Sequence, residues 1–557
     1  MLEKLIQNPR QSTLMYFILL LICIVWVYYP SLSVPFYLDD EGSIINSVAI
    51  HATSLDLLLQ SGLERRFIGY LSLWANYQVG GLDPLGYHVV NILIHIINSL
   101  LVFVLVLRLI RYFHPTEHAP TRYQQVLLVM AVAAIWALHP LNTQAVTYVV
   151  QRLASIVTVF YILTIICYIP LRQHPFTSEH KGKNITYAVL LIGSIIGGLH
   201  AKQNFVAVLV FLYCWELLTC SAHIRRYLLT LSLWIGLLLL LLMPFIPDFW
   251  LMLDNLTRET HAISRVEYFY TQQVVLWDYV WRFIYPFSLQ LNIDIVLQKS
   301  LTPLVALAML GHIVVLSIVY YYRKLIPLLI VGVVFFYTSH LIESFIFPIT
   351  DLAFEHRTYI GNIGLLLALA GLAQFWWQQK RPSKTIYLRM MFTVSGLLLI
   401  FSITTAKRNI LWQTPLEFYA NEVAQAPQQS RANASYGNEL MKLGRFDEAE
   451  PYLKKSVDIN LAKNKMTASG LTAYLTVLYH NNDYQKAAVV AMLGLKYINK
   501  PLERSNLLGK LAYGYIQMGM CDFAKGLLSS ALDLDPNNRE ARKNLDVCLL
   551  KLKQLGR

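Results

Sequence analysis

The chain has 557 residues, of which 56% are hydrophobic and only 14% are charged, and its formal net charge is +13. This composition excludes an ordinary soluble globular protein and favours a polytopic membrane protein. Nucleic-acid binding is not expected, because no compact basic motif with interleaved aromatic residues accompanies the positive charge.

Apolar stretches of about 17 to 25 residues, the length that crosses the hydrocarbon of a bilayer, recur up to residue 405. The first stretch is too long for the core of a signal peptide and lacks a small-x-small cleavage site, so we interpret it as a retained signal anchor. We predict about eleven spans, at residues 13–30, 86–108, 124–139, 144–169, 185–199, 204–220, 227–246, 302–321, 325–342, 360–377 and 386–404.

Basic residues sort the loops between these spans into two sides. The positive-inside rule places the basic set in the cytoplasm. The alternation requires residues 247–300 to enter and leave on one side, and their Trp- and Tyr-rich sequence, interrupted by Arg282 and Pro286, predicts an interfacial or re-entrant helix. The odd number of spans then places the C-terminus on the outer face. The basic set is Lys4, Arg10, Arg108, Arg111, Arg122, Arg172, Lys181, Lys183, Arg225, Arg226, Arg323, Lys324, Lys380, Arg381 and Lys384.

The pattern becomes soluble and helical after residue 405. The segments "GRFDEAEPYLKKSVDIN", "NDYQKAAVVAMLGLKYIN" and "CDFAKGLLSSALDLDPNN" align with Ala449, Ala487 and Ala524 in matching places, at a spacing slightly over the 34 residues of a tetratricopeptide unit. We therefore predict an all-α protein: a membrane bundle over residues 1–405, a linker over 406–430, and an α-solenoid over 431–557. The solenoid comprises about three repeats and a capping helix, and such arrays typically bind a peptide or a protein partner.

Cys521 opens one predicted repeat helix and Cys548 lies near the end of the next. Antiparallel stacking would bring the two thiols close, so an oxidising compartment could join them, although free thiols are an equal alternative. The six cysteines form no CxxC pair and no cluster with histidine, so no zinc site is predicted.

Three acids, Asp39, Asp40 and Glu41, follow the first span in "FYLDDEGSII". One interpretation is a solvated loop. The other is an active-site base held at the surface of the bilayer. The second is favoured because the predicted topology brings the charged and polar residues of the membrane half to the outer face, as one outward-facing cavity would require. These residues are Asp39, Asp40, His139, Arg152, Lys202, Arg282, Glu343, Asp351, Glu355, His356 and Arg357.

A polar stripe of His88, Asn91, His95 and Asn98 lies on one face of the second span. For His95 and Asn98, deeper in the bilayer, we favour hydrogen bonding between helices, whereas His88 near the surface suits a site equally well. The basic residues at the outer face indicate an anion, and a lipid phosphate matches a cavity at the level of the headgroups. The alternative is that these cations pair with Glu343, Asp351 or Glu355.

Five blocks in order resemble a known family. They are "FYLDD", "ERRFIGYLSLWANYQVGGLDPLGYHVVNILIHIINSLLVF", "ALHPLNTQAVTYVVQRLASI", "LHAKQNF" and "DLAFEHRTYIGNIG". Together with the repeats they are similar to the multi-spanning, tetratricopeptide-containing O-glycosyltransferases of the GT-C superfamily, which also holds the protein O-mannosyltransferases. The resemblance implies a polyprenyl-phosphate donor that carries one sugar and is used on the outer side of the membrane.

The resemblance also implies roles for particular residues. Asp39 and Asp40 are the candidate catalytic bases, with a slight preference for Asp39. The donor phosphate would be bound by Arg152, Lys202, His356 and Arg357, and the predicted topology adds Arg282 to this set. The pocket for the acceptor and the sugar would include Glu41, Arg66, His88, His139 and Glu355. The family usually has Lys-Glu where this chain has Lys202-Gln203, which weakens any role of that turn as a base or a metal ligand.

The expected chemistry is a single displacement that inverts the anomeric centre, with one carboxylate as base and cations at the leaving phosphate. No cofactor is required; a divalent metal would be compatible, but no ligand set supports one. The acceptor is expected to be an exported protein, such as a pilin-like subunit, that docks on the repeats. Two alternatives stay open: the same chemistry on an envelope glycan or lipid, and a non-enzymatic scaffold or flippase-like transporter. Short loops and few repeats favour a bacterial inner membrane with a periplasmic site; in a eukaryote the site would face the lumen of the endoplasmic reticulum.

Overall fold

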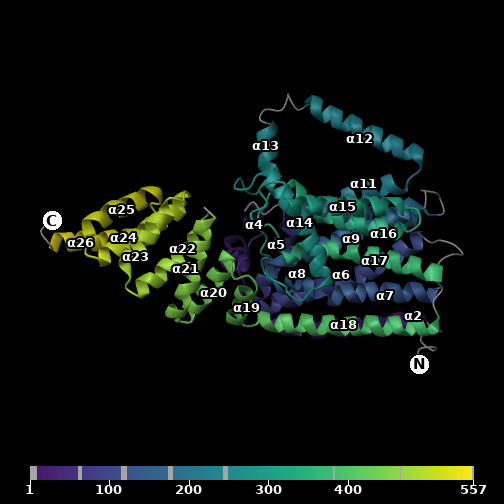
Figure 1. The fold of residues 1–557 in the computed structure, drawn as a ribbon, viewed down its shortest axis with the longest axis horizontal. Helices are drawn as coiled ribbons and strands as arrows, with labels where there is room; N and C mark the ends of the chain where they lie inside the picture. The colour runs from purple at the N-terminus through teal and green to yellow at the C-terminus, as the bar shows by residue number, and fades with distance from the viewer. Residues whose placement is uncertain are drawn as a thin grey trace. The chain divides into compact units, whose positions relative to one another are not determined.

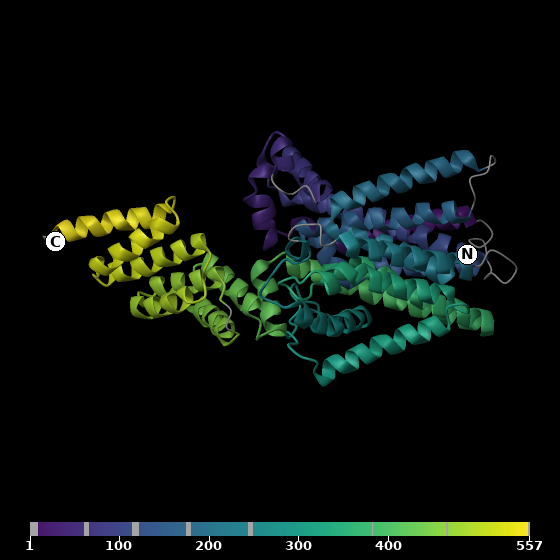
Figure 2. The same ribbon diagram turned by 90° about the horizontal axis from the view of Figure 1, so that it is seen from above.

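The structure is a computed structural model, and it describes residues 9–60, 66–113, 122–173, 180–242, 249–380, 383–463 and 466–554. The described residues form helices, short helical turns and loops, with no strand among them. The chain divides into two compact units, Met1–Gln413 and Thr414–Arg557 (Figures 1 and 2). The prediction of an all-α fold is confirmed.

The first unit contains, in chain order, α2 (Pro9–Tyr28), η1 (Tyr29–Ser33), η2 (Glu41–Ile45), α3 (Val48–His51), α4 (Asp56–Gln60), α5 (Phe67–Gly80), α6 (Pro84–Phe113), α7 (Arg122–Leu138), η4 (Pro140–Asn142), α8 (Thr143–Thr147), η5 (Val149–Gln151), α9 (Arg152–Gln173), α10 (Lys181–Ala201), η6 (Gln203–Val206), α11 (Ala207–Thr219), α12 (Ala222–Leu242), α13 (Phe249–Leu256), α14 (Arg265–Ile284), α15 (Pro303–Tyr321), α16 (Pro327–Leu341), η8 (Ile342–Ile346), η9 (Glu355–Arg357), α17 (Thr358–Lys380) and α18 (Lys384–Trp412).

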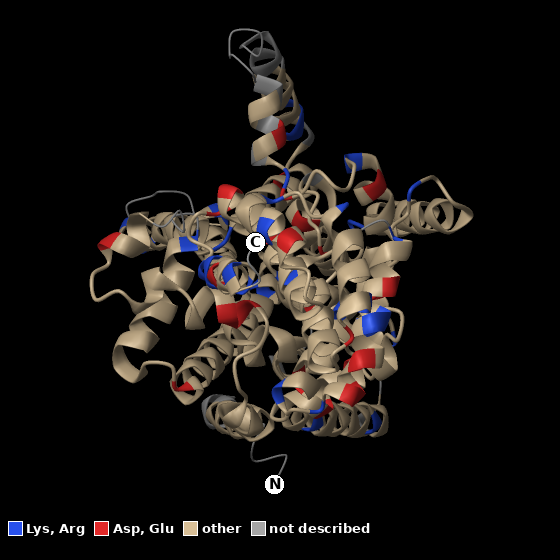
Figure 3. Ribbon diagram, turned by 90° about the vertical axis from the view of Figure 1, so that its left-hand side faces the viewer, with Lys and Arg blue, Asp and Glu red and all other residues tan. Residues whose placement is uncertain are grey.

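Eight helices of the described part are long and apolar enough to cross a membrane. A ninth span results if α7 and α8, which meet at a bend of 49°, are taken as one broken span. Charged residues occupy only short stretches of the ribbon (Figure 3), as expected for helices whose solvent is lipid. The eight spans are Leu14–Ser33, Pro84–Phe113, Val149–Gln173, Lys181–Ala201, Pro303–Tyr321, Pro327–Phe345, Glu355–Lys380 and Thr385–Trp412.

The described residues of the eleven predicted spans lie mainly in helices, but three of the spans are not among the eight full crossings. The stretch 124–139 forms α7, which is one half of the bent pair. The stretch 204–220 forms the shorter apolar helix Gln203–Thr219, because Lys202 interrupts the helical backbone before it. The stretch 227–246 begins in α12 and continues into residues outside the described part. Within 247–300, α14 begins at a capping box formed by Ser264 and Glu267 and is not among the membrane-crossing helices.

Helices α16 and α17 pack with their backbones in close approach. A Cβ atom on Gly332 would lie 2.3 Å from the backbone nitrogen of Ala368, and one on Gly364 would lie 2.6 Å from the carbonyl oxygen of Gly332. Gly371 faces the backbone of Leu329 in the same way, at 2.6 Å. Inside a membrane the hydrophobic effect does not drive helices together, because lipid tails are as apolar as side chains. Helices there associate through close packing, which small residues allow. This contact fixes the positions of the two ends of the connecting segment, residues 342–357.

The polar stripe of α6 forms the interhelical hydrogen bonds that its spacing predicts. His95 donates from Nε2 to the carbonyl oxygen of Ala137 (2.9 Å) and accepts at Nδ1 from the hydroxyl of Tyr359 (2.7 Å). Asn98 donates to the carbonyl oxygen of Ser155 (2.8 Å). Both side chains are fully buried, so α6, α7, α9 and α17 are tied together in the centre of the unit.

The second unit consists, among the described residues, of α19 (Pro415–Gln425), α20 (Ser430–Lys442), α21 (Phe446–Ala462), α22 (Ala468–His480), α23 (Tyr484–Leu495), α24 (Pro501–Gln517), α25 (Cys521–Leu534) and α26 (Arg539–Gln554). Each helix packs on the next, and α20, α22, α24 and α26 also contact one another in series. The matched alanines Ala449, Ala487 and Ala524 are fully buried in this stack. The arrangement is consistent with the predicted repeats.

The residues expected to form a linker, 406–430, are mostly helical: they contain the end of α18, all of α19 and the first residue of α20. The boundary between the compact units falls between Gln413 and Thr414. Both thiols of the second unit are free: Cys521 and Cys548 are buried, and the Cys548 Sγ lies 3.7 Å from the carbonyl oxygen of Cys521.

Candidate active site

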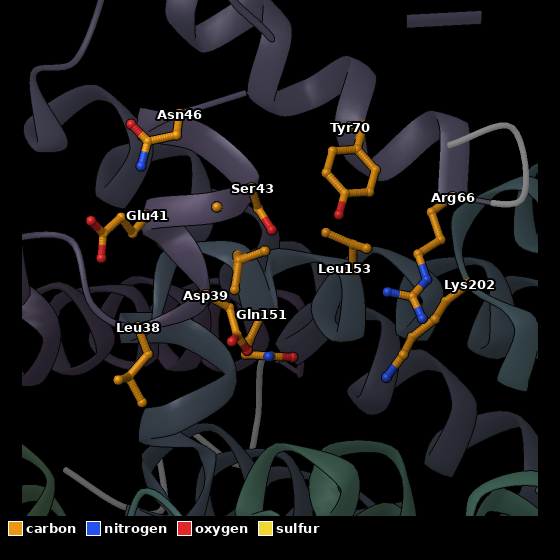
Figure 4. A pocket seen from close by; sticks show the side chains of 12 residues that line it. Leu38, Asp39, Glu41, Ser43, Asn46, Arg66, Tyr70, Gln151, Leu153 and Lys202 are labelled. Carbon is orange, nitrogen blue, oxygen red and sulfur yellow. The ribbon is translucent and has the colours of Figure 1, made fainter. Parts of the chain in front are cut away.

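A polar cavity of about 610 Å³ opens beside the loop that follows the first span. Four segments distant in sequence meet around it: the loop and η2, the start of α5, the turn into α9, and the turn after α10 (Figure 4). Its lining consists of Leu38, Asp39, Glu41, Gly42, Ser43, Asn46, Arg66, Tyr70, Val150, Gln151, Leu153 and Lys202.

The two adjacent aspartates occupy different environments. Asp39 is exposed and lines the cavity. Asp40 is fully buried, and its carboxylate accepts the backbone N–H of Tyr37 (3.0 Å) and of Val150 (2.8 Å). Successive side chains of an irregular loop point in different directions. Here Asp39 points into the cavity, whereas Asp40 points into the protein.

Lys202 and Arg66 form a cationic end of the cavity. In Figure 4 their charged groups lie together on one side, Asp39 and Gln151 lie in the middle, and Glu41 points away on the opposite side. Lys202 ends α10 in an extended conformation, with φ −162° and ψ 145°, which turns its side chain out of the helix. Among the described residues Arg66 makes no ion pair, so its charge is available to a ligand.

Glu343, which does not line the cavity, forms an ion pair with Lys202. Its Oε1 lies 2.9 Å from the Lys202 Nζ, and its Oε2 lies 3.9 Å from the Nε of Arg357. Arg357 also donates to the carbonyl oxygen of Asp351 (3.0 Å). Burial lowers the pKa of Lys202, Glu343 raises it, and the charges of Arg66 and Arg357 lower it. The pairing predicted as an alternative to anion binding is therefore present at Glu343, which pairs with two cations, Lys202 and Arg357.

Arg152 does not line the cavity. Each of its three nitrogens donates to a protein acceptor: Nε to Asn91 Oδ1 (2.5 Å), Nη1 to Asn76 Oδ1 (2.6 Å) and Nη2 to the carbonyl oxygen of Tyr87 (2.7 Å). The side chain is fully buried. Its guanidinium ties α9 to α5 and α6, and this use of its donors differs from the phosphate contact expected from the sequence.

Glu355 and Arg282 also lie in a supporting network, away from the cavity lining. Glu355 is fully buried, pairs with Arg408 (Nη2 to Oε2, 2.6 Å) and accepts the backbone N–H of Gln290. Arg282 pairs with Asp278 at 2.6 Å, one helical turn away. The two contacts of Glu355 link η9 to the segment after α14 and to α18. Arg408, on α18, was not expected from the sequence.

Three histidines of the expected site are packing residues in this structure. His88 bonds the carbonyl oxygen of Val34 (2.8 Å) and is fully buried. His139 donates from Nε2 to the carbonyl oxygen of Phe283 (3.0 Å) and accepts at Nδ1 from the Leu141 N–H. His356 is buried, and Gln144 Oε1 accepts its backbone N–H at 2.8 Å. Each of these contacts links segments that are distant in sequence.

Tyr148 is a site residue that sequence reasoning missed, although it lies in the quoted block "AVTYVVQR". Its hydroxyl accepts the backbone N–H of Asp39 at 2.8 Å, and its ring is only 3% exposed. Burial and the charges of Asp40 and Asp39 raise the pKa of this phenol above its usual range. In the part of the chain that the structure describes, no three His, Cys, Asp or Glu side chains come together as a metal site.

Comparison with known proteins identifies the relatives of the chain. Over 461 residues, 76% of its length, it is 23% identical to a protein O-mannosyl-transferase of Caenorhabditis elegans. The chain resembles the protein O-mannosyl-transferases. It is 30% identical over 178 residues, 30% of its length, to the Tmtc1 protein of that name from Drosophila melanogaster, and 29% identical over 154 residues, 25% of its length, to TMTC3 from Mus musculus.

The resemblance inferred from the sequence blocks is thereby confirmed. The chain spans 59% of the worm O-mannosyl-transferase, 19% of the fly one and 15% of the mouse one. No family model matches the chain.

Proposed function

We propose that this multi-pass membrane protein is a glycosyltransferase that moves one sugar from a polyprenyl-phosphate donor to a hydroxyl of an exported protein, on the outer face of the membrane. The observation that carries the proposal is the cavity. It joins an exposed carboxylate, Asp39, to a cationic end formed by Arg66 and Lys202. The names of the relatives support protein O-glycosylation as the reaction class.

The cavity suits a single displacement at the anomeric carbon. The acceptor oxygen forms a bond to that carbon while the bond from the carbon to the phosphate oxygen breaks. Asp39 takes the proton of the hydroxyl, and the electron pair of the broken bond leaves with the lipid monophosphate. Arg66 and Lys202 stabilise the charge that develops on the phosphate, so two protein cations can replace a metal ion. The attack from the face opposite the phosphate inverts the anomeric centre.

The lipid donor explains why the site lies beside membrane spans. A polyprenyl phosphate keeps its tail in the bilayer and its phosphate at the level of the headgroups, next to the ends of α2, α9 and α10. Arg supplies a rigid fork for phosphate oxygens, whereas Lys acts as a point charge. In this proposal Arg357 acts through Glu343 on Lys202, and the second unit presents a surface on which the acceptor protein docks.

Intact-mass spectrometry of exported proteins tests this function. Cells would carry the wild-type protein, the Asp39→Asn variant, the control Asp56→Asn, or none. Asp56 is an exposed acid of the same outer segment that does not line the cavity. We expect a mass increase of one sugar on an exported protein with wild type and Asp56→Asn only. An altered envelope glycan or lipid, with no protein modified, would move the acceptor to that class. No difference in either would refute a transferase.

A further inference from the structure

The loop that carries Asp39 is held in an unfavourable backbone shape. Leu38, the residue before Asp39, has φ +37°, which side chains other than glycine rarely adopt and which costs of the order of 1 kcal/mol. The loop is anchored next to it by the hydroxyl of Tyr37, which donates to the carbonyl oxygen of Trp412 at 2.5 Å. A strained loop keeps its shape only where surrounding contacts determine it, so the contacts of Asp39 and its neighbours decide where the carboxylate points.

Asp40 supplies two of these contacts. One oxygen bonds the N–H of Tyr37, three residues back in the same loop, and the other bonds the N–H of Val150 in the turn before α9. An ionised carboxylate accepts at both oxygens, whereas an asparagine would present an NH₂ group to one of the two N–H donors. The fully buried Asp40 has no surface toward the cavity, so it cannot receive a proton from a bound hydroxyl.

Tyr148 supplies the third contact, directly to Asp39. Its hydroxyl accepts the Asp39 N–H at 2.8 Å, and its ring lies 6.0 Å from the ring of Trp412, centroid to centroid. The backbone on both sides of the Asp39 side chain is therefore fixed from the same short segment, 148–150. A displacement of about 1 Å in a reacting group lowers rates by about a hundredfold, so such fixing matters for proton transfer.

We propose that the two adjacent aspartates have separate and non-exchangeable roles: Asp39 exchanges the proton, while Asp40, together with Tyr148, is a positioning residue that holds the strained loop so that Asp39 faces the acceptor. This inference rests on the proposed function and specifies how its base is oriented.

The separation of roles has a consequence for pH. The charged or titratable groups around Asp40 are Asp39, Tyr148 and Arg152. Burial raises the pKa of Asp40 to about 7, although the two backbone N–H bonds and Arg152 oppose this shift. A proton on Asp40 removes the charge that strengthens both bonds. Turnover is therefore expected to fall as the pH decreases through about 7, and this decrease should be absent in Asp40→Asn.

The test uses the full chain in lipid nanodiscs, with the polyprenyl-phosphate form of the sugar and the acceptor that the mass measurement identifies. We expect Asp39→Asn to lower kcat by about 10³-fold at every pH, within the usual range for a lost general base. Asp40→Asn and Tyr148→Phe should each lower kcat by about 10- to 100-fold with KM for the donor unchanged. Tyr148→Phe keeps the ring, so it tests the hydroxyl if Asp40→Asn does not fold.

Amide hydrogen exchange gives a readout that does not need activity. In Asp40→Asn the amides of Tyr37 and Val150 should lose protection, while Asp39→Asn should leave them protected. Unchanged protection in Asp40→Asn would overturn the inference, as would a variant Asp39→Asn that stays active while Asp40→Asn is inactive. In that second case the transferase itself would still stand. A wild-type protein that transfers no sugar would refute the proposed function instead, whatever the exchange pattern.

Discussion

Removal of the Glu343 carboxylate should destabilise the first unit and change the pH dependence of donor binding. The substitution Glu343→Gln keeps the size of the side chain but leaves Lys202 and Arg357 without their shared anion. At the 2.9 Å between Glu343 Oε1 and Lys202 Nζ, the Coulomb attraction is about 6 kcal/mol for an effective dielectric constant of about 20. Loss of one partner of a buried pair costs about 3–5 kcal/mol. The lower value, about 3 kcal/mol, is expected here because the Lys202 side chain is 12% exposed at the cavity.

Thermal and denaturant unfolding of the purified protein in detergent measures the free-energy difference. Glu41→Gln is a matched control: it also replaces a glutamate by glutamine, but Glu41 lines the cavity, is exposed and makes no ion pair among the described residues, so the stability of the protein should change by less than about 0.5 kcal/mol. Equal stability of the two variants would refute the reasoning.

Donor binding gives a second readout of the same substitution. Glu343 raises the pKa of Lys202, so its loss lowers that pKa further. Lys202 should then lose its proton at a lower pH, and the alkaline decrease in donor affinity should begin earlier than in wild type. An unchanged alkaline limit would show that Lys202 does not bind the donor phosphate.

Four further predictions follow from the packing and the site. Gly364→Ala should destabilise the protein by about 1–3 kcal/mol, because the new methyl group would meet the backbone of α16, whereas Gly396→Ala has open space and should not. His95→Ala should cost about 1–2 kcal/mol, since it leaves the Tyr359 hydroxyl and the Ala137 carbonyl without their shared partner; unfolding measurements would show no loss if the stripe were lipid-facing. Arg66→Ala should raise KM for the donor at least tenfold with a smaller effect for Arg66→Lys, whereas equal effects would argue against a bidentate phosphate contact. Burial raises the pKa of the Cys548 thiol to about 12, so it should react with maleimide at pH 7 only after denaturation; rapid labelling of the native protein would contradict the packing of α25 against α26.

The length and hydrophobicity of the apolar stretches predicted the helices well, because both depend on residues close in sequence. The lengths of the apolar stretches placed the described residues of the expected spans mainly on helices, and the spacing of Ala449, Ala487 and Ala524 identified three equivalent buried positions. The helical state of the expected linker was missed, because nothing in its composition distinguishes a short polar helix from a loop.

The roles of individual polar residues could be predicted less well, since they depend on partners far along the chain. Arg152 has the side chain that binds phosphate best, yet carbonyl and amide oxygens of α5 and α6 surround it. No pattern in the sequence shows that Tyr87 and Asn76 would supply them. Arg66 was expected in the pocket for the acceptor and the sugar; it lines the cavity, and its place beside Lys202, far along the chain, could not be predicted. Which of Asp39 and Asp40 is proposed as the base depends on the hydrogen bonds from backbone N–H groups to Asp40. Two adjacent aspartates in a sequence do not reveal these bonds.

The close approach of α16 and α17 has a consequence for how the protein is made. Because three glycines let the two backbones touch, the pair can leave the insertion machinery as one hairpin rather than as separate helices. The connecting residues 342–357 contain Glu343, Asp351, Glu355 and a single Arg, so the position of the two helices decides where these charges lie. A substitution of one of these glycines would therefore act while the protein inserts into the membrane. A misplaced helix pair would also misplace the charged loop 342–357, although the substituted residue does not contact that loop.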